Sequence, residues 1–241
     1  MDAKNKNGPL KGLIVIDLTR VLAGPYASMI LSDLGARIIK VEPPLGDDSR
    51  EFSPFINNQS AYFASLNREK ESIKLDLKSE KDKLIFEELI KNADILLENY
   101  KPGTMEKLGY GYKSLSKKYP NLIYASCSGF GQTGPWASKP AYDMIVQGMG
   151  GLMSVTGHEG QEPVRVGTSI GDITAGLFTT IGILASLIDK NKHGNGQAID
   201  VSMLDCQIAI LENAIARYFA TGESPPPGGS RHPAIAPFEC Y

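Results

Sequence analysis

The spacing of short, strand-like runs is the feature that most constrains how this chain can fold. Short and mostly apolar runs are typical of strands buried on both faces of a parallel sheet. They are found at Gly12–Leu18, Arg37–Glu42, Ala93–Asn99, Leu122–Cys127 and Gln197–Ser202, with an alternating edge strand at Ser72–Leu77. Helical spacing and capping residues between them predict helices at Tyr26–Leu34, Ser79–Asn92, Tyr142–Met149, Ile173–Leu187 and Leu204–Ala220. Because strands and helices alternate, we predict an α/β fold with a Rossmann-like, mostly parallel open sheet and flanking helices.

A Pro/Gly-rich segment near the end of the chain divides this prediction into two parts. Residues Thr221–Arg231 include three consecutive prolines and two consecutive glycines, a composition typical of a linker between structured units. We therefore predict a large α/β domain over residues 1–220, followed by a linker and the start of a second, small domain over residues 221–241. We expect most of that small domain to be missing from this chain.

Composition argues against several classes of protein. The net charge is −2, so we expect no general basic surface for nucleic acid or a membrane. No segment reaches about 18 uninterrupted apolar residues, and the polar segment Met1–Leu10 has no apolar core, so we expect neither a membrane span nor a signal peptide. The three cysteines lack CxxC spacing and the three histidines fit no metal site. We therefore expect no disulfide framework, no bound metal and a cytoplasmic location.

A GxGxxG pattern spans Gly129–Gly134, directly after a predicted strand. In a dinucleotide-binding fold this pattern opens a helix, whose N-terminus receives the pyrophosphate. Pro135 and Pro140 follow here and disfavour such a helix start, and no acid lies on a following strand at about +20. We therefore predict a Gly-rich loop that approaches a ligand through its backbone, and not a nicotinamide site.

Basic residues cluster where predicted strands begin or end. Arg68 and Lys70 precede the edge strand, and Lys101 and Lys107 follow the strand at Ala93–Asn99. Because ligands of open α/β sheets lie beyond the carboxyl ends of the strands, these cations are candidates for binding phosphates. The alternative is ordinary, solvated surface charge.

Asp172 is the first candidate for a nucleophile. It lies between a glycine-containing loop and an apolar helical run, and no other acid follows until Asp189. A carboxylate can attack an acyl thioester and hold the acyl group as an anhydride, which divides one difficult step into two easier ones. The alternative is structural, because Asp before an apolar helix is a common N-cap.

Taken together and in order, these segments resemble the class III CoA-transferases, the CaiB/BaiF family that includes formyl-CoA transferase. The resemblance covers nearly the whole chain. It rests on Gly12–Asp17 with Ala23-Gly24-Pro25, Asp33–Ala36 with Lys40-Val41-Glu42, Asn67–Lys70 with Leu75–Leu77, Asp94–Asn99 with Pro102-Gly103, Ser128–Pro135, Tyr142-Asp143, Gly171-Asp172, Gly194–Gln197 and Arg231-His232-Pro233.

The resemblance implies roles for individual residues. Asp172 falls on the family's catalytic aspartate, which forms anhydride and aspartyl-CoA thioester intermediates. With Arg68 included for its charge, the implied CoA contacts are Leu22, Ala23, Arg68, Lys70, Asn99, Tyr100 and Lys107. The implied acyl pocket is lined by Phe130, Gln132 and Tyr142. Two positions depart from the family: Leu22 stands where formyl-CoA transferase has Gln, and Pro43 stands where some members have an Arg that binds the CoA nucleotide.

Tyr142 favours one branch of the family. In the related α-methylacyl-CoA racemases a His at this position exchanges the α-proton, and Tyr, with an ordinary pKa of about 10, is a poor partner for that task. The resemblance therefore implies an acyl-CoA:carboxylate CoA-transferase that acts on an acyl-CoA and a carboxylic acid, holds no permanent cofactor, and forms an interlocked homodimer when full length. The alternatives are a racemase-like or carnitine dehydratase-associated member, or an inactive CoA-binding fragment.

Overall fold

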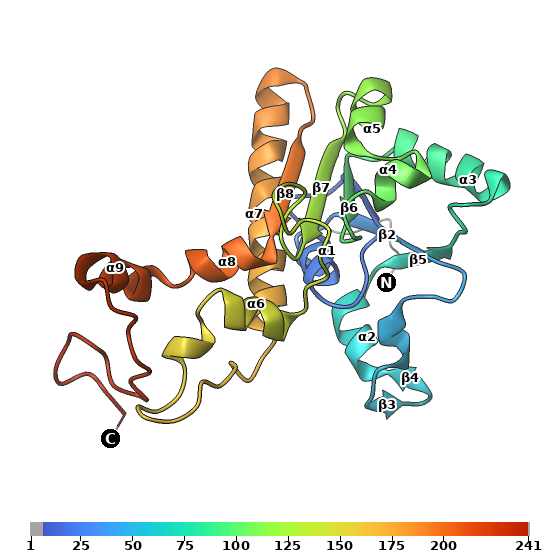
Figure 1. Cartoon of the computed structure of the whole chain (residues 1–241). Coiled ribbons are helices and arrows are strands. Elements are labelled where there is room, and N and C mark those ends of the chain that lie inside the picture. The colour runs from blue at the N-terminus through green and yellow to red at the C-terminus, as the bar shows by residue number, and fades with distance from the viewer. Residues whose placement is uncertain (1–6, 241) are drawn as a thin grey trace.

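The computed structural model describes residues 7–240, and it confirms the predicted α/β fold. Six strands form one sheet in the order β5-β2-β1-β6-β7-β8, and every pair of neighbours is parallel (Figure 1). The strands are β1 Ile14–Asp17, β2 Arg37–Glu42, β5 Glu71–Lys74, β6 Ile95–Glu98, β7 Ile123–Ser128 and β8 Ala198–Ser202. The edge position predicted for the strand near Ser72 is confirmed, because β5 lies at one end of the sheet.

Helices cover both faces of the sheet, and each face has its own apolar core. On one face, α3 (Glu80–Lys91), α4 (Thr104–Leu108) and α5 (Tyr112–Lys118) pack against side chains such as Ile16 and Leu96. On the other face, the helices are α1 (Ala23–Asp33) and α7 (Ile170–His193). They cover the alternate side chains of the same strands, for example those of Val15, Ile95 and Leu97. Burial on both faces explains why these strands are short, continuous apolar runs.

Contact between α1 and α7 fixes one end of the molecule. A Cβ added to Gly176 of α7 would lie 2.7 Å from the carbonyl oxygen of Ala23, so only glycine permits this close approach of the two helices. Asp172 precedes Gly176 by four residues and therefore lies on the same face of α7. The Asp172 side chain is thus directed toward the beginning of α1.

Three predicted helices have different boundaries in the structure. α1 begins at Ala23 rather than Tyr26, because Pro25 occupies the first turn, where a missing N–H costs nothing. α7 begins at Ile170 and continues to His193, six residues beyond the predicted end. The single helix predicted from Leu204 to Ala220 is wrong: α8 (Met203–Ala209) and α9 (Glu212–Thr221) are separated at Leu211, which is buried and has ψ 37°.

Some elements were not predicted because they are too short to show a periodic pattern. These are the antiparallel hairpin β3–β4, helix α2, and helices α4 and α5; β3 is Phe55–Ile56, β4 is Gln59–Ser60 and α2 is Ala61–Asn67. α6 (Asp143–Met149) matches its prediction, and Tyr142 occupies the N-cap position.

α7 is the one helix among residues 7–240 whose length and composition would allow it to cross a membrane. Half of its apolar window is buried inside this chain, against α1 and the sheet. α9 and the segment that follows it extend away from the sheet (Figure 1). The division of the chain at residue 221 stays a prediction.

Candidate active site

The carboxyl ends of β1 and β6 form the point at which the strand order reverses, where open α/β sheets bind their ligands. The loop of residues 18–22, called the β1–α1 loop below, begins at this point. Asn99, which follows β6, holds it: Asn99 Nδ2 donates to the Arg20 carbonyl, and the Arg20 N–H donates to Asn99 Oδ1, each at 2.8 Å. Asn99, a predicted CoA contact, thus anchors this loop.

A hollow of about 420 Å³ opens beside the loop, over the ends of β1, β2, β5 and β6. The Arg20 guanidinium lies 5.6 Å from the centre of the Tyr100 ring, so a charge and a ring share one wall. The lining residues are Leu18, Arg20, Val41, Glu42, Pro43, Pro44, Leu75, Asp76, Leu77, Lys78, Tyr100, Lys101, Thr104 and Leu108. Three cations above an apolar floor suit a ligand that carries phosphates and a planar ring.

Asp172 is the third residue of α7, and Ser169 occupies the N-cap position. The capping interpretation of Asp172 is therefore wrong, since no side-chain hydrogen bond caps this end of α7. Instead the Asp172 carboxyl lies near the backbone of Ala23 at the start of α1, which favours its ionised form. The structure thus brings together two residues that were predicted from different parts of the sequence.

The surroundings of Asp172 oppose its negative charge. Burial and the charge of Asp143 together raise the pKa of Asp172 to about 6, against a smaller lowering by the backbone of Ala23. No cation contributes to this pKa. A carboxylate with such a pKa is about nine-tenths ionised at pH 7 and incompletely stabilised, as an active nucleophile requires.

A relay from α6 fixes the first turn of α7. Asp143 Oδ1 accepts a hydrogen bond from the Gly171 N–H at 2.8 Å, and Asp143 Oδ2 accepts one from Gln147 Nε2 at 2.7 Å. The fully buried Gln147 in turn accepts a hydrogen bond from the Val166 N–H at 2.9 Å. The loop before α7 and the turn that carries Asp172 are therefore held by the same two side chains.

Lys70, a predicted phosphate contact, has buried partners instead. Its side chain is 1% exposed, and its Nζ lies 3.4 Å from Asp17 Oδ2 and donates to Ser28 Oγ at 2.7 Å. Next to it, Lys40 Nζ lies 2.8 Å from Asp47 Oδ2, and both of these side chains are also buried. We call Asp17, Lys40, Asp47 and Lys70 the buried charge cluster. In this structure Lys70 reaches the cluster and not the hollow.

Two other predicted cations lie outside the hollow. Arg68 is half-exposed and forms an ion pair with Asp33 of α1. Lys107 is exposed on α4 and is not among the residues that line the hollow. Leu22 occupies the N-cap position of α1 and directly precedes Ala23.

The predicted acyl-pocket residues lie in the loop between β7 and α6. The Phe130 ring meets the Trp136 ring edge-on, with centroids 5.5 Å apart. The Gln132 N–H donates to the Asp200 carboxylate at 2.9 Å, and its side-chain Nε2 is buried without a hydrogen-bond partner. Tyr142 is 73% exposed and precedes Asp143. No helix follows the GxGxxG pattern directly, which agrees with the rejection of a dinucleotide site.

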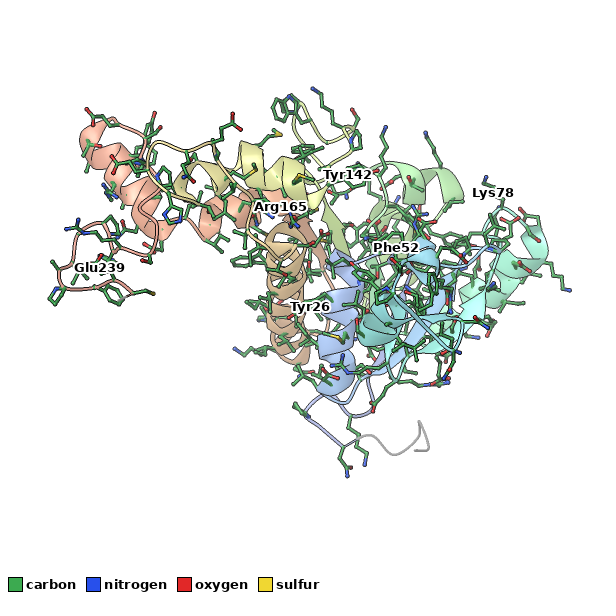
Figure 2. All side chains as sticks on the ribbon, turned by 90° about the horizontal axis from the view of Figure 1, so that it is seen from below. Tyr26, Phe52, Lys78, Tyr142, Arg165 and Glu239 are labelled. Carbon is green, nitrogen blue, oxygen red and sulfur yellow. The ribbon has the colours of Figure 1, made fainter. Side chains whose placement is uncertain are left out.

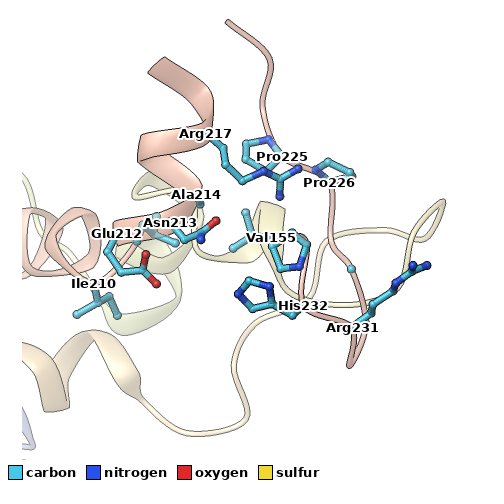
Figure 3. A pocket seen from close by; sticks show the side chains of 14 residues that line it. Val155, Ile210, Glu212, Asn213, Ala214, Arg217, Pro225, Pro226, Arg231 and His232 are labelled. Carbon is cyan, nitrogen blue, oxygen red and sulfur yellow. The ribbon is translucent and has the colours of Figure 1, made fainter. Parts of the chain in front are cut away.

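A second hollow, of about 290 Å³, lies between α9 and the C-terminal segment (Figure 3). Arg217, Arg231 and His232 contribute polar groups to it. None of the predicted site residues lines it, so we place the candidate site at the strand ends and at Asp172. Among residues 7–240, no group of three or more His, Cys, Asp or Glu side chains could hold a metal ion.

Sequence reasoning missed the residues that act through tertiary contacts. Arg20 and Lys78 follow β1 and β5 closely, so the rule about strand ends could have found them. Gln147 gives no such signal, because a glutamine in a short helix is ordinary until the loop at Val166 is seen to pack on it.

Comparison with known proteins agrees with this geometry. The profile of CoA-transferase family III matches residues 10–241. The chain belongs to this family. The resemblance derived from the sequence is therefore confirmed.

Three family III relatives illustrate the likeness. Acetyl-CoA:oxalate CoA-transferase of Acetobacter aceti is 52% identical over 97% of this chain and 61% of its own length. Succinyl-CoA:glutarate CoA-transferase of Mus musculus is 42% identical over 97% of this chain and 54% of its own length. The crystal structure of a CAIB/BAIF family protein from Brucella suis superposes with a TM-score of 0.92, at 43% identity, over 97% of this chain and 63% of that one. The family III chain thus spans roughly 54–63% of the length of these relatives.

Proposed function

We propose that this family III chain carries the CoA-binding site and the nucleophile of an acyl-CoA:carboxylate CoA-transferase. The observation that carries the proposal is the position of Asp172: a half-buried carboxylate with a raised pKa, beside the loop that lines a cationic hollow. The CoA nucleotide lies in the hollow, with its phosphates near Arg20, Lys78 and Lys101 and its base against Tyr100. The pantetheine arm follows the β1–α1 loop toward Ala23.

The chemistry needs no general base. An Asp172 carboxylate oxygen attacks the thioester carbonyl carbon, a C–O bond forms, the C–S bond breaks, and CoA thiolate leaves. Thiolate then attacks the Asp172 carbonyl carbon of the anhydride, which releases the first acid as a carboxylate and leaves an aspartyl thioester. The acceptor carboxylate repeats the two steps in reverse order. Every nucleophile and every leaving group is an anion, so no proton moves, and none of the groups that shift the pKa of Asp172 needs to be a His.

Mass spectrometry tests the covalent steps. The chain is incubated with a panel of acyl-CoAs, trapped with hydroxylamine, digested and sequenced. We expect the modification at Asp172 and its loss in Asp172→Asn. Asp189→Asn, on the same helix but half-exposed beside His193, is the matched control and should label normally. Labelling elsewhere, or none while CoA binds, would refute the nucleophile. Solvent deuterium at the α-carbon without acyl exchange would favour the racemase-like alternative.

Binding measurements test the hollow. We expect Arg20→Gln with Lys101→Gln to weaken CoA binding about 10-fold in calorimetry, since two charged contacts are lost. Pantetheine, which lacks the nucleotide, should bind both forms equally. Lys113→Gln, an exposed lysine on α5, is the control. Equal CoA binding by the wild type and both variants would contradict the placement of the CoA nucleotide in this hollow.

We further propose a dicarboxylic acid as substrate. The oxalate and glutarate named for the two relatives each carry two carboxylates. Arg165, on the loop between α6 and α7 (Figure 2), donates only to the carbonyls of Val166 and Gly167, and no carboxylate pairs with it among residues 7–240. Arg165→Gln should therefore reduce turnover with glutarate much more than with butyrate. Equal loss with both acids would contradict this role.

Two broader expectations complete the proposal. We propose an interlocked homodimer, supported by large apolar side chains that α8 and α9 leave exposed, such as Ile208, Tyr218 and Phe219. Light scattering of the purified chain tests it, and a monomer at all concentrations would contradict it. We also propose that the protein acts in the cytoplasm and needs no permanent cofactor. Three free cysteines suit a reducing compartment.

A further inference from the structure

The β1–α1 loop has an unusual backbone at Val21, where φ is 65°. A β-branched residue rarely adopts this left-handed conformation, because its side chain crowds the backbone. Such a conformation persists only when the surroundings hold it in place. The loop ends at Leu22, and the next residue, Ala23, packs closely on Gly176, one turn after Asp172, so that its backbone lies near the Asp172 carboxyl.

Buried ions hold the loop on the side away from the hollow. The Thr19 N–H donates to Asp17 Oδ1 at 2.9 Å, and Lys40 Nζ donates to the Thr19 carbonyl at 2.6 Å. The Val21 N–H donates to Asp47 Oδ1 at 3.2 Å. Three members of the buried charge cluster therefore contact the backbone of Thr19 and Val21. Asn99 holds Arg20, the residue between them.

The fourth member of the cluster secures the beginning of α1. Lys70 Nζ donates to the Pro25 carbonyl at 3.0 Å and to Ser28 Oγ, while it lies beside Asp17. The cluster thus spans the loop and the first turn of α1. Ala23 lies between the two segments that the cluster holds.

Net stability is a weak reason for such a cluster. Taking two ammonium groups and two carboxylates out of water costs about as much as their attraction returns, and apolar residues of similar volume often serve equally well. What apolar residues could not supply is a set of directional bonds to backbone N–H and carbonyl groups. The cluster therefore has a geometric role.

We propose that the buried charge cluster positions the start of α1, and with it the Ala23 N–H, beside the Asp172 carboxyl. Its members are positioning residues: they touch neither substrate nor Asp172, and they act through the β1–α1 loop. The proposal rests on the function proposed above for its effect on turnover, but the Ala23–Asp172 geometry can be measured without any substrate. The other titratable groups that influence or sense Asp172 are Asp143, Tyr62 and Cys127.

The test uses the amide resonance of Ala23 in the ¹⁵N-labelled chain. In the wild type we expect this amide shift to follow the titration of Asp172, with a midpoint of about 6, and to lose that titration in Asp172→Asn. Lys40→Met with Asp47→Asn removes one ion pair without leaving a buried charge, and Asn retains the oxygen that accepts from Val21. We expect the Ala23 shift change to fall by about half and the Asp172 midpoint to rise by about 0.5 pH unit.

Turnover provides a second readout. A slightly misplaced donor should reduce kcat about 10-fold to 100-fold while KM for acyl-CoA changes less than about 2-fold. The matched control is Lys118→Met with Glu87→Gln, which removes an exposed Lys–Glu pair far from the loop. It should leave both the Ala23 titration and kcat unchanged.

The outcomes are distinguishable. The positioning role would be overturned if the wild-type Ala23 amide shift did not follow the titration of Asp172. It would also be overturned by a folded double variant with an unchanged Ala23 titration. The expected titrations in a chain that never turns over would refute the proposed function and leave the positioning role standing. If the double variant does not fold, Asp17→Asn with Lys70→Met, which removes the other ion pair of the cluster, decides: an unchanged Ala23 titration in that folded variant overturns the proposal.

Discussion

Asp17, at the end of β1, and Asp172, on α7, lie near opposite ends of the β1–α1 loop. Both are at least partly removed from water, yet their pKa values shift in opposite directions. Burial alone would raise the pKa of Asp17, but Lys70, Lys40 and two hydroxyl groups lower it to about 2. Burial and a neighbouring acid together raise the pKa of Asp172 to about 6. Burial therefore does not decide what a carboxylate does; its partners do. Asp17 stays ionised and holds the structure, whereas the weakly stabilised Asp172 anion is suited to attack an electrophile.

Exchanging Asp172 for Asn should break the comparison on the catalytic side, with the largest effect. An amide cannot form the anhydride, so kcat for CoA transfer should fall about 10³-fold to 10⁴-fold or more. Steady-state exchange of labelled acid into acyl-CoA measures this. Retained turnover in Asp172→Asn would assign the chemistry to another group.

Exchanging Asp17 for Asn breaks the comparison on the structural side. Lys70 then stands unpaired in the interior, and the free energy of unfolding should fall by about 3–5 kcal/mol. Adding Lys70→Met should restore most of it, because no isolated charge remains. Urea unfolding at pH 7 measures both variants. A double variant no more stable than Asp17→Asn would mean that the pair contributes through more than its charges.

Replacement by Asn should change the free energy of unfolding in opposite directions at the two carboxylates: it falls for Asp17→Asn and rises for Asp172→Asn. The pKa of folded Asp172 is raised above the unfolded value, so its ionisation disfavours the fold, and the penalty grows as pH rises from about 4 to about 6. Asp172→Asn should therefore raise the free energy of unfolding by about 2 kcal/mol at pH 7.5 and by almost nothing near pH 4. Urea unfolding across that range checks it, with Asp189→Asn as control. A destabilised Asp172→Asn at pH 7.5 would contradict the raised pKa.

The contrast between Asp17 and Asp172 also explains which features could be predicted from the sequence. The strands and the family could be predicted, because buried strands are visible as apolar runs. Asp172 is a candidate nucleophile because it lies at a recognisable junction, and its role stays a prediction. The capping interpretation failed because the helix begins three residues earlier than its apolar pattern does, at Ile170. Lys70 was expected near a phosphate because of its place beside a strand and the family resemblance; only the fold shows that it lies beside Asp17. The tertiary fold decides which charges pair, and a single position in a sequence does not reveal its partner.

The smallest effect concerns Asp143, which links the two kinds of carboxylate. Its charge raises the pKa of Asp172, while its hydrogen bonds to Gly171 and Gln147 hold the turn. With the wild type, acyl transfer should decline below pH of about 6 as Asp172 is protonated. In Asp143→Asn, loss of the repulsive charge should move that decline lower by less than about 1 pH unit, with a modest loss of kcat from the altered bond to Gln147. Single-turnover rates from pH 4.5 to 8 measure the midpoint, and Asp189→Asn should leave it in place. A midpoint that moves upward would mean that the hydrogen bonds of Asp143, and not its charge, govern the proton affinity of Asp172.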